Sequence, residues 1–369
     1  MTTAPGLRRA LAATERDVGC RVLAARDTGS RSRGLAGPDS DHDVQVVYVQ
    51  PSVRYVTLAG YVESVEPATE PPLELSGWNV RRFAELLSSS NPAAVAFLTS
   101  PVRHRTYEPL AALETAVAEG VDPVGLYHHY RSLARNQYRK YLQRTLLDGD
   151  DPVWVIEDED ADGYTVRPYD PDGNGAKGGG GGDAENGDAD GPGGDTPTPA
   201  TERLSKPTRY RESTVDRSVK RTLHVLRAGL AARYVLAHHA PSPASFAALV
   251  DAAATLPTPS AAEAGAAVGE QTPEDPPGAR GVDREWVAAA RRLAERKRAG
   301  EGSATVTGVV GPAIVPPERV DYAAHGGDRP EVAAIDRFLE RAVADAPRGT
   351  TTDATDAPDT THPTDGRQQ

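Results

Sequence analysis

Cysteine, lysine and long apolar runs are scarce in this chain of 369 residues. Cys20 is the single cysteine, so no intramolecular disulfide can form and a zinc site built from cysteines is excluded. The sequence has no run of about 18 apolar residues, the minimum for a membrane-spanning helix. The N-terminal residues also lack an apolar signal core. We therefore expect a cytoplasmic protein that does not associate with a membrane.

Acidic residues outnumber basic ones, 53 Asp and Glu against 41 Lys and Arg, and the net charge is −12. Only five basic residues are lysines: Lys140, Lys177, Lys206, Lys220 and Lys297. This balance is typical of halophilic proteins, because a Debye length of ~3 Å at 1 M salt screens the repulsion between acidic groups. An ordinary acidic cytosolic protein can have the same composition. In both cases, binding of nucleic acid would require a local basic surface.

The patterning predicts the α+β fold class, with a small mixed-sheet domain followed by an α-helical domain. Strand and helix patterns alternate over residues 1–105, which is typical of a compact α/β domain. Residues 106–255 have mainly helical periodicity, interrupted at about 148–212 by a hairpin and an acidic, Gly-rich insertion that we expect to be disordered. Residues 256–369 are interpreted as a linker, two helices and a disordered tail.

Two amphipathic segments of the helical domain, 122–147 and 219–234, carry apolar stripes of similar length and are expected to pack together. Segments 153–156 and 164–166 between them predict the hairpin. Arg227 and Arg233 lie on the second helix and either contact phosphate or RNA, or pair with the acidic surface. The basic run 291–298 is interpreted as a solvated helix face.

The stretch from residue 29 to residue 44 carries the chemistry that is easiest to interpret. It reads Gly29-Ser30-Arg31-Ser32-Arg33-Gly34 and then Asp41-His42-Asp43-Val44. Alternate side chains of an extended strand share a face, so Asp41 and Asp43 are expected to point the same way. Paired carboxylates suit a hard divalent cation, while the N–H groups of a glycine turn and Ser30 Oγ suit a phosphate. Together they predict phosphoryl-group chemistry.

Further motifs extend this pattern. They are Leu73-Glu74-Leu75, Ser76-Gly77-Trp78-Asn79-Val80-Arg81-Arg82, Ser90-Asn91-Pro92 and the arginine-bearing helix around Leu226-Arg227. With the first stretch, they resemble the DNA polymerase β superfamily of nucleotidyltransferases, and more closely a stand-alone microbial and phage group sometimes found near RNA-repair enzymes. The resemblance covers roughly residues 15–150 and 213–255. His42 stands where an apolar residue is usual, and Asn79 stands where Asp is more common.

The resemblance implies a Mg²⁺-dependent nucleotidyltransferase that moves an NMP from an NTP to a hydroxyl, on RNA ends as the first choice and on protein as the second. The residues implied as catalytic and as ligands of two Mg²⁺ ions are Asp41, Asp43 and Glu74. The residues implied in nucleotide binding are Gly29, Ser30, Arg31 and Arg33.

Two alternatives remain open at this level. A single Glu between leucines, such as Glu74, is also common on the surface of an edge strand. For the whole chain, the rival hypothesis is a non-catalytic, nucleotide-binding regulatory or antitoxin-like module, in which the same fold binds an NTP or a partner protein without turnover.

Overall fold

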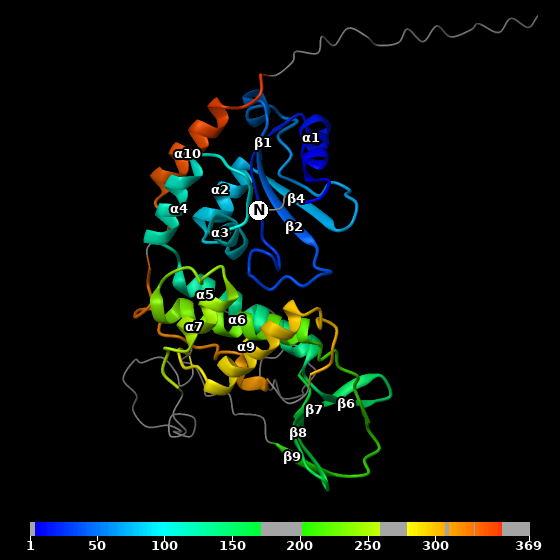
Figure 1. Cartoon of the computed structure of the whole chain (residues 1–369). Helices are drawn as coiled ribbons and strands as arrows, with labels where there is room; N and C mark the ends of the chain where they lie inside the picture. Colours follow the sequence, from blue (N-terminus) through cyan, green and yellow to red (C-terminus); the bar gives the residue numbers. More distant parts are fainter. Residues whose placement is uncertain (1–3, 171–200, 259–278, 307–309, 328, 349–369) are drawn as a thin grey trace, which may run out of the picture. The chain divides into compact units, whose positions relative to one another are not determined.

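The fold is α+β, as the sequence predicts (Figure 1). The computed structural model describes residues 4–170, 201–258, 279–306, 310–327 and 329–348. Most of the insertion predicted to be disordered, residues 171–200, lies outside the described residues, as does the tail from residue 349 onward.

The chain forms two compact units, and each is assembled from separated segments. The first unit comprises Met1–Gly29, Asp41–Val117 and Pro330–Gln369. The second comprises Ser30–Ser40 and Ala118–Arg329. The motif from Gly29 to Asp43 therefore contributes residues to both units.

The first unit is built on a five-stranded mixed sheet with the order β3-β4-β2-β1-β5. Its strands are β1 (Arg21–Asp27), β2 (His42–Val49), β3 (Ser64–Val65), β4 (Leu73–Asn79) and β5 (Arg103–Arg105). β2 and β4 pair in parallel, and the other neighbouring strands pair antiparallel. The valine-rich β2 is buried at every position except Asp43, as expected for a central strand.

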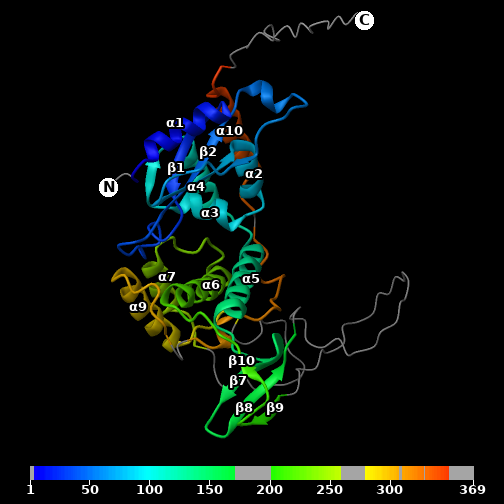
Figure 2. The same ribbon diagram turned by 90° about the vertical axis from the view of Figure 1, so that its right-hand side faces the viewer.

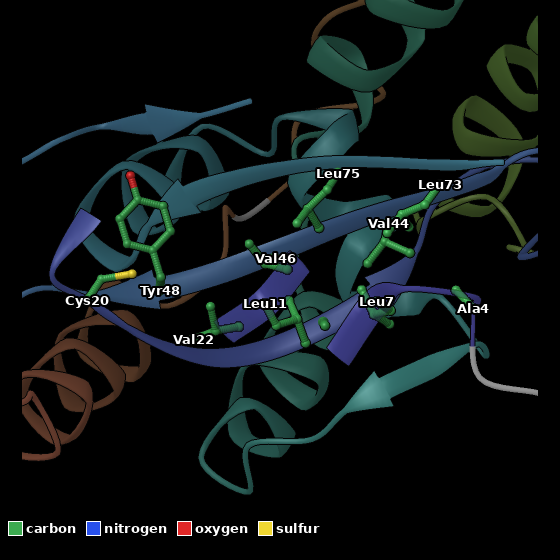
Figure 3. Close-up of a cluster of buried hydrophobic side chains, with 11 residues drawn as sticks. Ala4, Leu7, Leu11, Cys20, Val22, Val44, Val46, Tyr48, Leu73 and Leu75 are labelled. Carbon is green, nitrogen blue, oxygen red and sulfur yellow. The ribbon is translucent and has the colours of Figure 1, made fainter. Parts of the chain in front are cut away.

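Helix α1 (Leu7–Val18) covers one face of this sheet. Leu7 and Leu11 pack against Val44 and Val46 of β2 and against Leu75 of β4, as Figure 3 shows. The apolar periodicity of α1 matches this contact, because residues four apart lie on the same side of a helix.

The opposite face of the sheet is covered by α2 (Val80–Ser88) and α3 (Pro92–Thr99) (Figure 1). The rings of Phe83 and Phe97 meet edge to face with their centroids 5.4 Å apart. Phe338 of α10 (Val332–Ala344) packs on Phe83 at 6.1 Å and on Tyr107 at 6.3 Å. The sequence had placed α10 in a separate C-terminal region, whereas the structure makes it part of the first unit. Helix α4 (Leu110–Glu119) and the short 3₁₀ helix η1 (Ser52–Tyr55) complete the local helices.

The second unit is centred on two long helices, α5 (Pro123–Tyr141) and α6 (Val219–His238), which pack together as their stripes predict. Helices α7 (Phe246–Ala253) and α9 (Arg284–Arg298) pack on α6. Figure 2 shows α5, α6, α7 and α9 as one helical group. A short 3₁₀ helix, η2 (Pro312–Ile314), contacts α6 as well.

The second unit also contains a five-stranded antiparallel sheet with the order β10-β6-β7-β8-β9. Its strands are β6 (Thr145–Asp148), β7 (Asp151–Glu159), β8 (Gly163–Pro168), β9 (Glu202–Ser205) and β10 (Arg211–Glu212). The predicted hairpin is β7–β8, in which Ile156 lies opposite Val166. The sequence does not indicate β6, β9 and β10. Residues 145–147 of β6 fall in the segment 122–147 that the sequence predicts as helical, whereas α5 ends at Tyr141. Strands β9 and β10 are short and carry few apolar residues.

None of the helices in the described part of the chain combines the length and the hydropathy that a membrane span requires.

Candidate functional site

Asp43 and Glu74, which we call the acid pair, lie on neighbouring parallel strands of the first unit. Asp43 of β2 is directly opposite Glu74 of β4 in the strand register. Leu73 and Leu75 face the core on the α1 side, so the alternation of β4 places Glu74 on the other face, with Asp43. Asp43 is half-buried and Glu74 is exposed. Leu73 and Leu75 flank Glu74 because they face the buried core on the other side of the sheet. Glu74 itself is the residue of β4 that lies opposite Asp43 of β2.

Gly29 leaves the space that the Asp43 carboxylate occupies. A Cβ atom added at Gly29 would overlap the carboxylate oxygen and carbon of Asp43. The backbone of the same turn is tied to β2, because Thr28 N–H donates to the carbonyl oxygen of Asp43 at 2.9 Å. Glycine is therefore required here for close approach of a side chain.

Asp27 is a site residue that the sequence reasoning missed. Its side chain is fully buried, and its Oδ1 accepts a hydrogen bond from Gly29 N–H at 3.0 Å. This Asx-type turn sets the path of the chain as it leaves β1. The Asp-x-Gly spacing at the end of a strand was the available signal.

Asp41 is exposed and precedes β2, which begins at the buried His42. His42 N–H donates to the carbonyl oxygen of Pro72 at 2.7 Å, which fixes the start of β2 beside β4. Within the described residues, no three His, Cys, Asp or Glu side chains form a group that holds a metal ion. The structure thus brings Asp43 and Glu74 together, and Asp41 as a third ligand remains a prediction.

The acid pair fits Mg²⁺ by its donor chemistry. Mg²⁺ prefers oxygen ligands and is usually held by one or two carboxylates, with water and substrate phosphates in its other positions. Two adjacent carboxylates on a sheet face, one of them half-buried against a glycine, meet that requirement.

Asn79, which departs from the more common Asp, has a structural role. Its Oδ1 accepts a hydrogen bond from Arg81 N–H at 3.0 Å and so caps the N-terminus of α2. The same oxygen accepts a hydrogen bond from the Tyr55 hydroxyl at 3.1 Å. Asn and Asp are equally good N-caps, so this departure leaves the acid pair unaffected.

The loop of residues 30–40, which carries Ser30, Arg31 and Arg33, is folded by its own backbone bonds in the second unit. Leu35 N–H donates to the Ser30 carbonyl at 2.9 Å, and Gly34 N–H donates to the Arg31 carbonyl at 3.1 Å. Gly34 has φ of +67°, a left-handed conformation that favours glycine. The Arg31 guanidinium donates to the Ser40 carbonyl at 2.7 Å and closes the loop.

A group of basic side chains, which we call the basic stripe, lines one side of α6. Its members are Lys220, Arg221, His224 and Arg227. Between Thr222 and Arg233, His224 and Arg227 are the two positions of α6 that are not buried. Arg221 pairs with Asp216 at 3.5 Å, whereas Arg227 makes no ion pair with the described residues.

The charges around His224 show how strongly positive this surface is. Burial, and after it the positive charges of Arg33, Arg227 and the other stripe residues, together lower the pKa of His224 to about 4. Arg33 is held near α7, because its carbonyl accepts a hydrogen bond from Phe246 N–H at 2.9 Å. Loop 30–40 and α6 therefore contribute cations to the same region of the second unit.

The prediction for Arg233 is wrong, because its side chain is buried and contacts neither solvent nor acidic groups. It is 2% exposed and donates to the carbonyl oxygens of Gly229, Ala313 and Ile314 at 3.0, 2.9 and 2.6 Å. Its guanidinium also lies over the Trp286 ring at 4.8 Å. Burial lowers the pKa of Arg233 to about 10. Arg233 holds η2 against α6.

A model of the RNA repair pathway DNA polymerase beta family matches residues 5–264. The chain belongs to this family. The family match includes the acid pair, loop 30–40 and the basic stripe, whereas α9 and α10 lie beyond it.

Over 133 residues the chain is 31% identical to the uncharacterized protein YcgL of Bacillus subtilis (strain 168). The aligned part is 35% of this chain and 50% of the Bacillus protein, so the chain spans half the length of this relative. No solved structure matches the chain.

Proposed function

We propose that this chain is a Mg²⁺-dependent nucleotidyltransferase that transfers an NMP from an NTP to a hydroxyl group at an RNA end. Family membership supports a nucleotidyltransferase-type function in RNA repair. The observation that carries the proposal is the acid pair, in which Asp43 and Glu74 lie opposite each other on parallel strands and the Asp43 carboxylate rests against Gly29.

The proposed reaction forms one bond and breaks one. The acceptor hydroxyl oxygen attacks the α-phosphorus of the NTP, the bond to the bridging β-phosphate oxygen breaks, and pyrophosphate leaves with that electron pair. The hydroxyl proton is released to solvent. No oxidant or further reactant is needed.

Asp43 and Glu74, with Asp41 as the predicted third ligand, would hold Mg²⁺, which lowers the pKa of an acceptor hydroxyl and neutralises charge on the triphosphate. The chain's own contribution is to hold these carboxylates in place. The hydrogen bond from Thr28 N–H fixes the backbone of Asp43, and Gly29 allows its carboxylate to lie against the turn.

Loop 30–40 supplies the groups that would bind the phosphates. Backbone N–H groups in a tight glycine turn form a concave anion site, and Ser30 adds a hydroxyl group. Arg31 and Arg33 add charge-assisted hydrogen bonds, which are roughly twice as strong as neutral ones. We therefore propose that Ser30, Arg31 and Arg33 bind the triphosphate of the NTP.

The basic stripe favours RNA over a protein hydroxyl as the acceptor. A chain with a net charge of −12 repels polyanions in general, yet Lys220, Arg221 and Arg227 are concentrated with Arg33 around His224. Lys and Arg side chains that contact phosphates displace counterions and so provide sequence-independent affinity for nucleic acid. A protein acceptor has no comparable need for this surface.

The test compares acceptors and acid variants in one assay. Purified protein is incubated with labelled NTPs and Mg²⁺ in the presence of RNA or of a protein pool, and both label transfer and pyrophosphate release are measured. We expect label on RNA, and at least a ~100-fold loss of transfer in the Asp41→Asn, Asp43→Asn double variant, because removal of catalytic groups that act together typically has effects of this size or larger.

The matched control is Glu66→Gln, which neutralises an exposed acid in the connection between β3 and β4. It should leave transfer unchanged. Full turnover in the double variant would contradict the proposal. Label on protein alone would reject RNA as the acceptor, and a stoichiometric co-purifying protein without pyrophosphate release would favour the regulatory module.

A further inference from the structure

The C-terminal end of α9 contacts loop 30–40 directly. Lys297 Nζ donates to Ser40 Oγ at 3.3 Å, and Arg298 Nε donates to the Gly34 carbonyl at 2.9 Å. Gly37 packs so closely on α9 that an added Cβ would lie 2.7 Å from the Lys297 carbonyl oxygen. The end of one helix therefore holds the loop at three points.

These contacts fall on the part of the loop that determines its shape. Ser40 Oγ, the acceptor for Lys297, also accepts a hydrogen bond from Gly37 N–H at 2.9 Å. The Ser40 carbonyl is the acceptor for Arg31. Ser40 is the last residue of the loop and immediately precedes Asp41 in the chain. A contact that fixes Ser40 therefore restrains the end of the loop next to the acidic motif.

Helix α9 is itself firmly attached to the second unit. Trp286, Ala290 and Leu293 are buried, and the helix packs on α6 and α7. Arg291 pairs with Asp251 of α7 at 2.9 Å, and the Arg233 guanidinium lies over Trp286. A helix fixed in this way can restrain a loop that touches its end.

The contacts come from outside the family match, which ends at residue 264. The sequence predicts a solvated face for the run 291–298, whereas Lys297 is half-buried and both Lys297 and Arg298 donate to loop 30–40. Arg292 of the same run is exposed and makes no ion pair with the described residues. In the run 291–298, Lys297 and Arg298 therefore contact loop 30–40, whereas Arg292 is a solvated surface residue.

We propose that the end of α9 positions the nucleotide-binding loop, with Lys297 and Arg298 as the positioning residues. This inference rests on the proposed function of loop 30–40. Ordering the backbone of a loop carries an entropic cost, and a loop that is already ordered binds its ligand without that cost. The contacts of α9 order the loop before the NTP arrives, so their loss should weaken NTP binding more than it slows the chemical step.

The experiment uses the full-length chain with Lys297→Met and Arg298→Met, which keep most of each side chain and remove its donated hydrogen bond. Arg292→Met is the matched control on the same helix. We measure amide hydrogen exchange of the ligand-free protein, and KM for NTP, KM for RNA and kcat. The exchange measurement needs no activity.

We expect faster exchange confined to the amides of residues 34–40 in the two variants. KM for NTP should rise about three- to tenfold, the range expected for loss of one or two hydrogen bonds, with smaller changes in kcat and in KM for RNA. Lys297→Arg retains a donor and should recover most of the NTP affinity. The Arg292→Met control should match the wild type.

Unchanged loop exchange in both variants would overturn the inference, as would faster loop exchange with unchanged KM for NTP. If Lys297→Met accelerates exchange throughout the second unit, Arg298→Met, which changes an exposed side chain and leaves the buried face of α9 intact, must reproduce the loop effect. Failure to do so would also overturn it. The proposed function fails separately, if the acid double variant keeps its turnover.

Discussion

At the scale of a single residue, Gly29 is needed because the Asp43 carboxylate packs directly against it. Its φ is not in the left-handed region, so a larger residue is compatible with its backbone conformation. The restriction comes from Asp43, whose carboxylate fills the position of the missing Cβ. Gly29 is thus required by a neighbouring side chain from another strand.

The Gly29→Ala variant should separate stability from activity. The added methyl group must displace the Asp43 side chain, and we expect a fall of ~1–3 kcal/mol in the free energy of unfolding, as for other overpacked sites. Because a shift of about 1 Å in a reacting group lowers rates by about 100-fold, transfer should be nearly lost while the protein remains folded. Denaturant unfolding and labelled-NTP transfer measure the two effects.

The matched control is Gly311→Ala, since a Cβ at Gly311 meets nothing within 4 Å. Both its stability and its activity should equal those of the wild type. Normal transfer by Gly29→Ala would show that the position of the Asp43 carboxylate is not critical.

The sequence predicts the environment of a single residue correctly where that environment follows from the alternation of side chains along a strand. Leu73, Glu74 and Leu75 alternate between two sheet faces, as period-two patterning requires. Arg233 shows where such reasoning fails. Its partners are the carbonyl oxygens of Ala313 and Ile314, about 80 residues away, and a one-dimensional pattern does not indicate buried carbonyls as acceptors.

At the scale of the element, α6 is a largely buried helix with one basic side, on which Lys220 is exposed and Arg221, His224 and Arg227 are half-buried. The apolar positions pack against α5, α7 and α9, and the remaining surface carries the basic stripe. Positive charges near one another raise the energy of the folded state unless an anion binds between them. This clustering of positive charge is the observation behind the proposal that a polyanion binds at the basic stripe.

His224 should make the folded protein sensitive to mild acid. Its pKa is lowered from 6.5 to about 4 in the folded state by burial and by the neighbouring cations. Between these two values the unfolded chain binds the proton more readily, so the contribution to stability present above pH 6.5 is lost as pH falls toward 4. Thermal unfolding of wild type and His224→Gln at pH 7.0 and pH 4.5 measures this.

The fall in unfolding temperature between the two pH values should be smaller in His224→Gln than in wild type. His238→Gln, which replaces an exposed histidine on the same helix, should behave as the wild type does. Equal falls in all three proteins would show that His224 does not govern the acid response.

At the scale of the whole molecule, the overall negative charge and the basic stripe would act in opposite directions on RNA, the proposed acceptor. A net charge of −12 repels a polyanion at long range, and we expect the stripe to attract it at contact distance. The balance between them depends on ionic strength, because only exposed charges separated by more than a Debye length are largely screened.

Arg227→Gln should weaken RNA binding with equal effect on different RNA sequences. The slope of log K against log salt should become shallower by about one unit, because one phosphate contact is lost. KM for NTP should change little. Fluorescence anisotropy with labelled RNA over a salt series is the measurement. Arg319→Gln, an exposed arginine elsewhere in the second unit, is the control and should keep the wild-type slope. A wild-type slope for Arg227→Gln would exclude the stripe as a phosphate contact.

The C-terminal segments show what organises the chain at this largest scale. Helix α10 completes the aromatic cluster around Phe83 in the first unit, and α9 supports α6 and loop 30–40 in the second. The sequence had grouped both helices with a separate linker region. Their apolar sides were evident from periodicity, but their partners were not, because an amphipathic pattern specifies that a face is buried and not what buries it.

The sequence by itself determined the α+β class, the pairing of α5 with α6 and the motif that led to the family. These features depend on local periodicity and on residue types at short spacing, which can be read along one dimension. Tertiary structure alone decided that Glu74 lies beside Asp43, that Gly29 makes room for a carboxylate and that Lys297 holds Ser40. Each of these depends on strand register or helix docking, and both are set by the packing of segments distant in sequence.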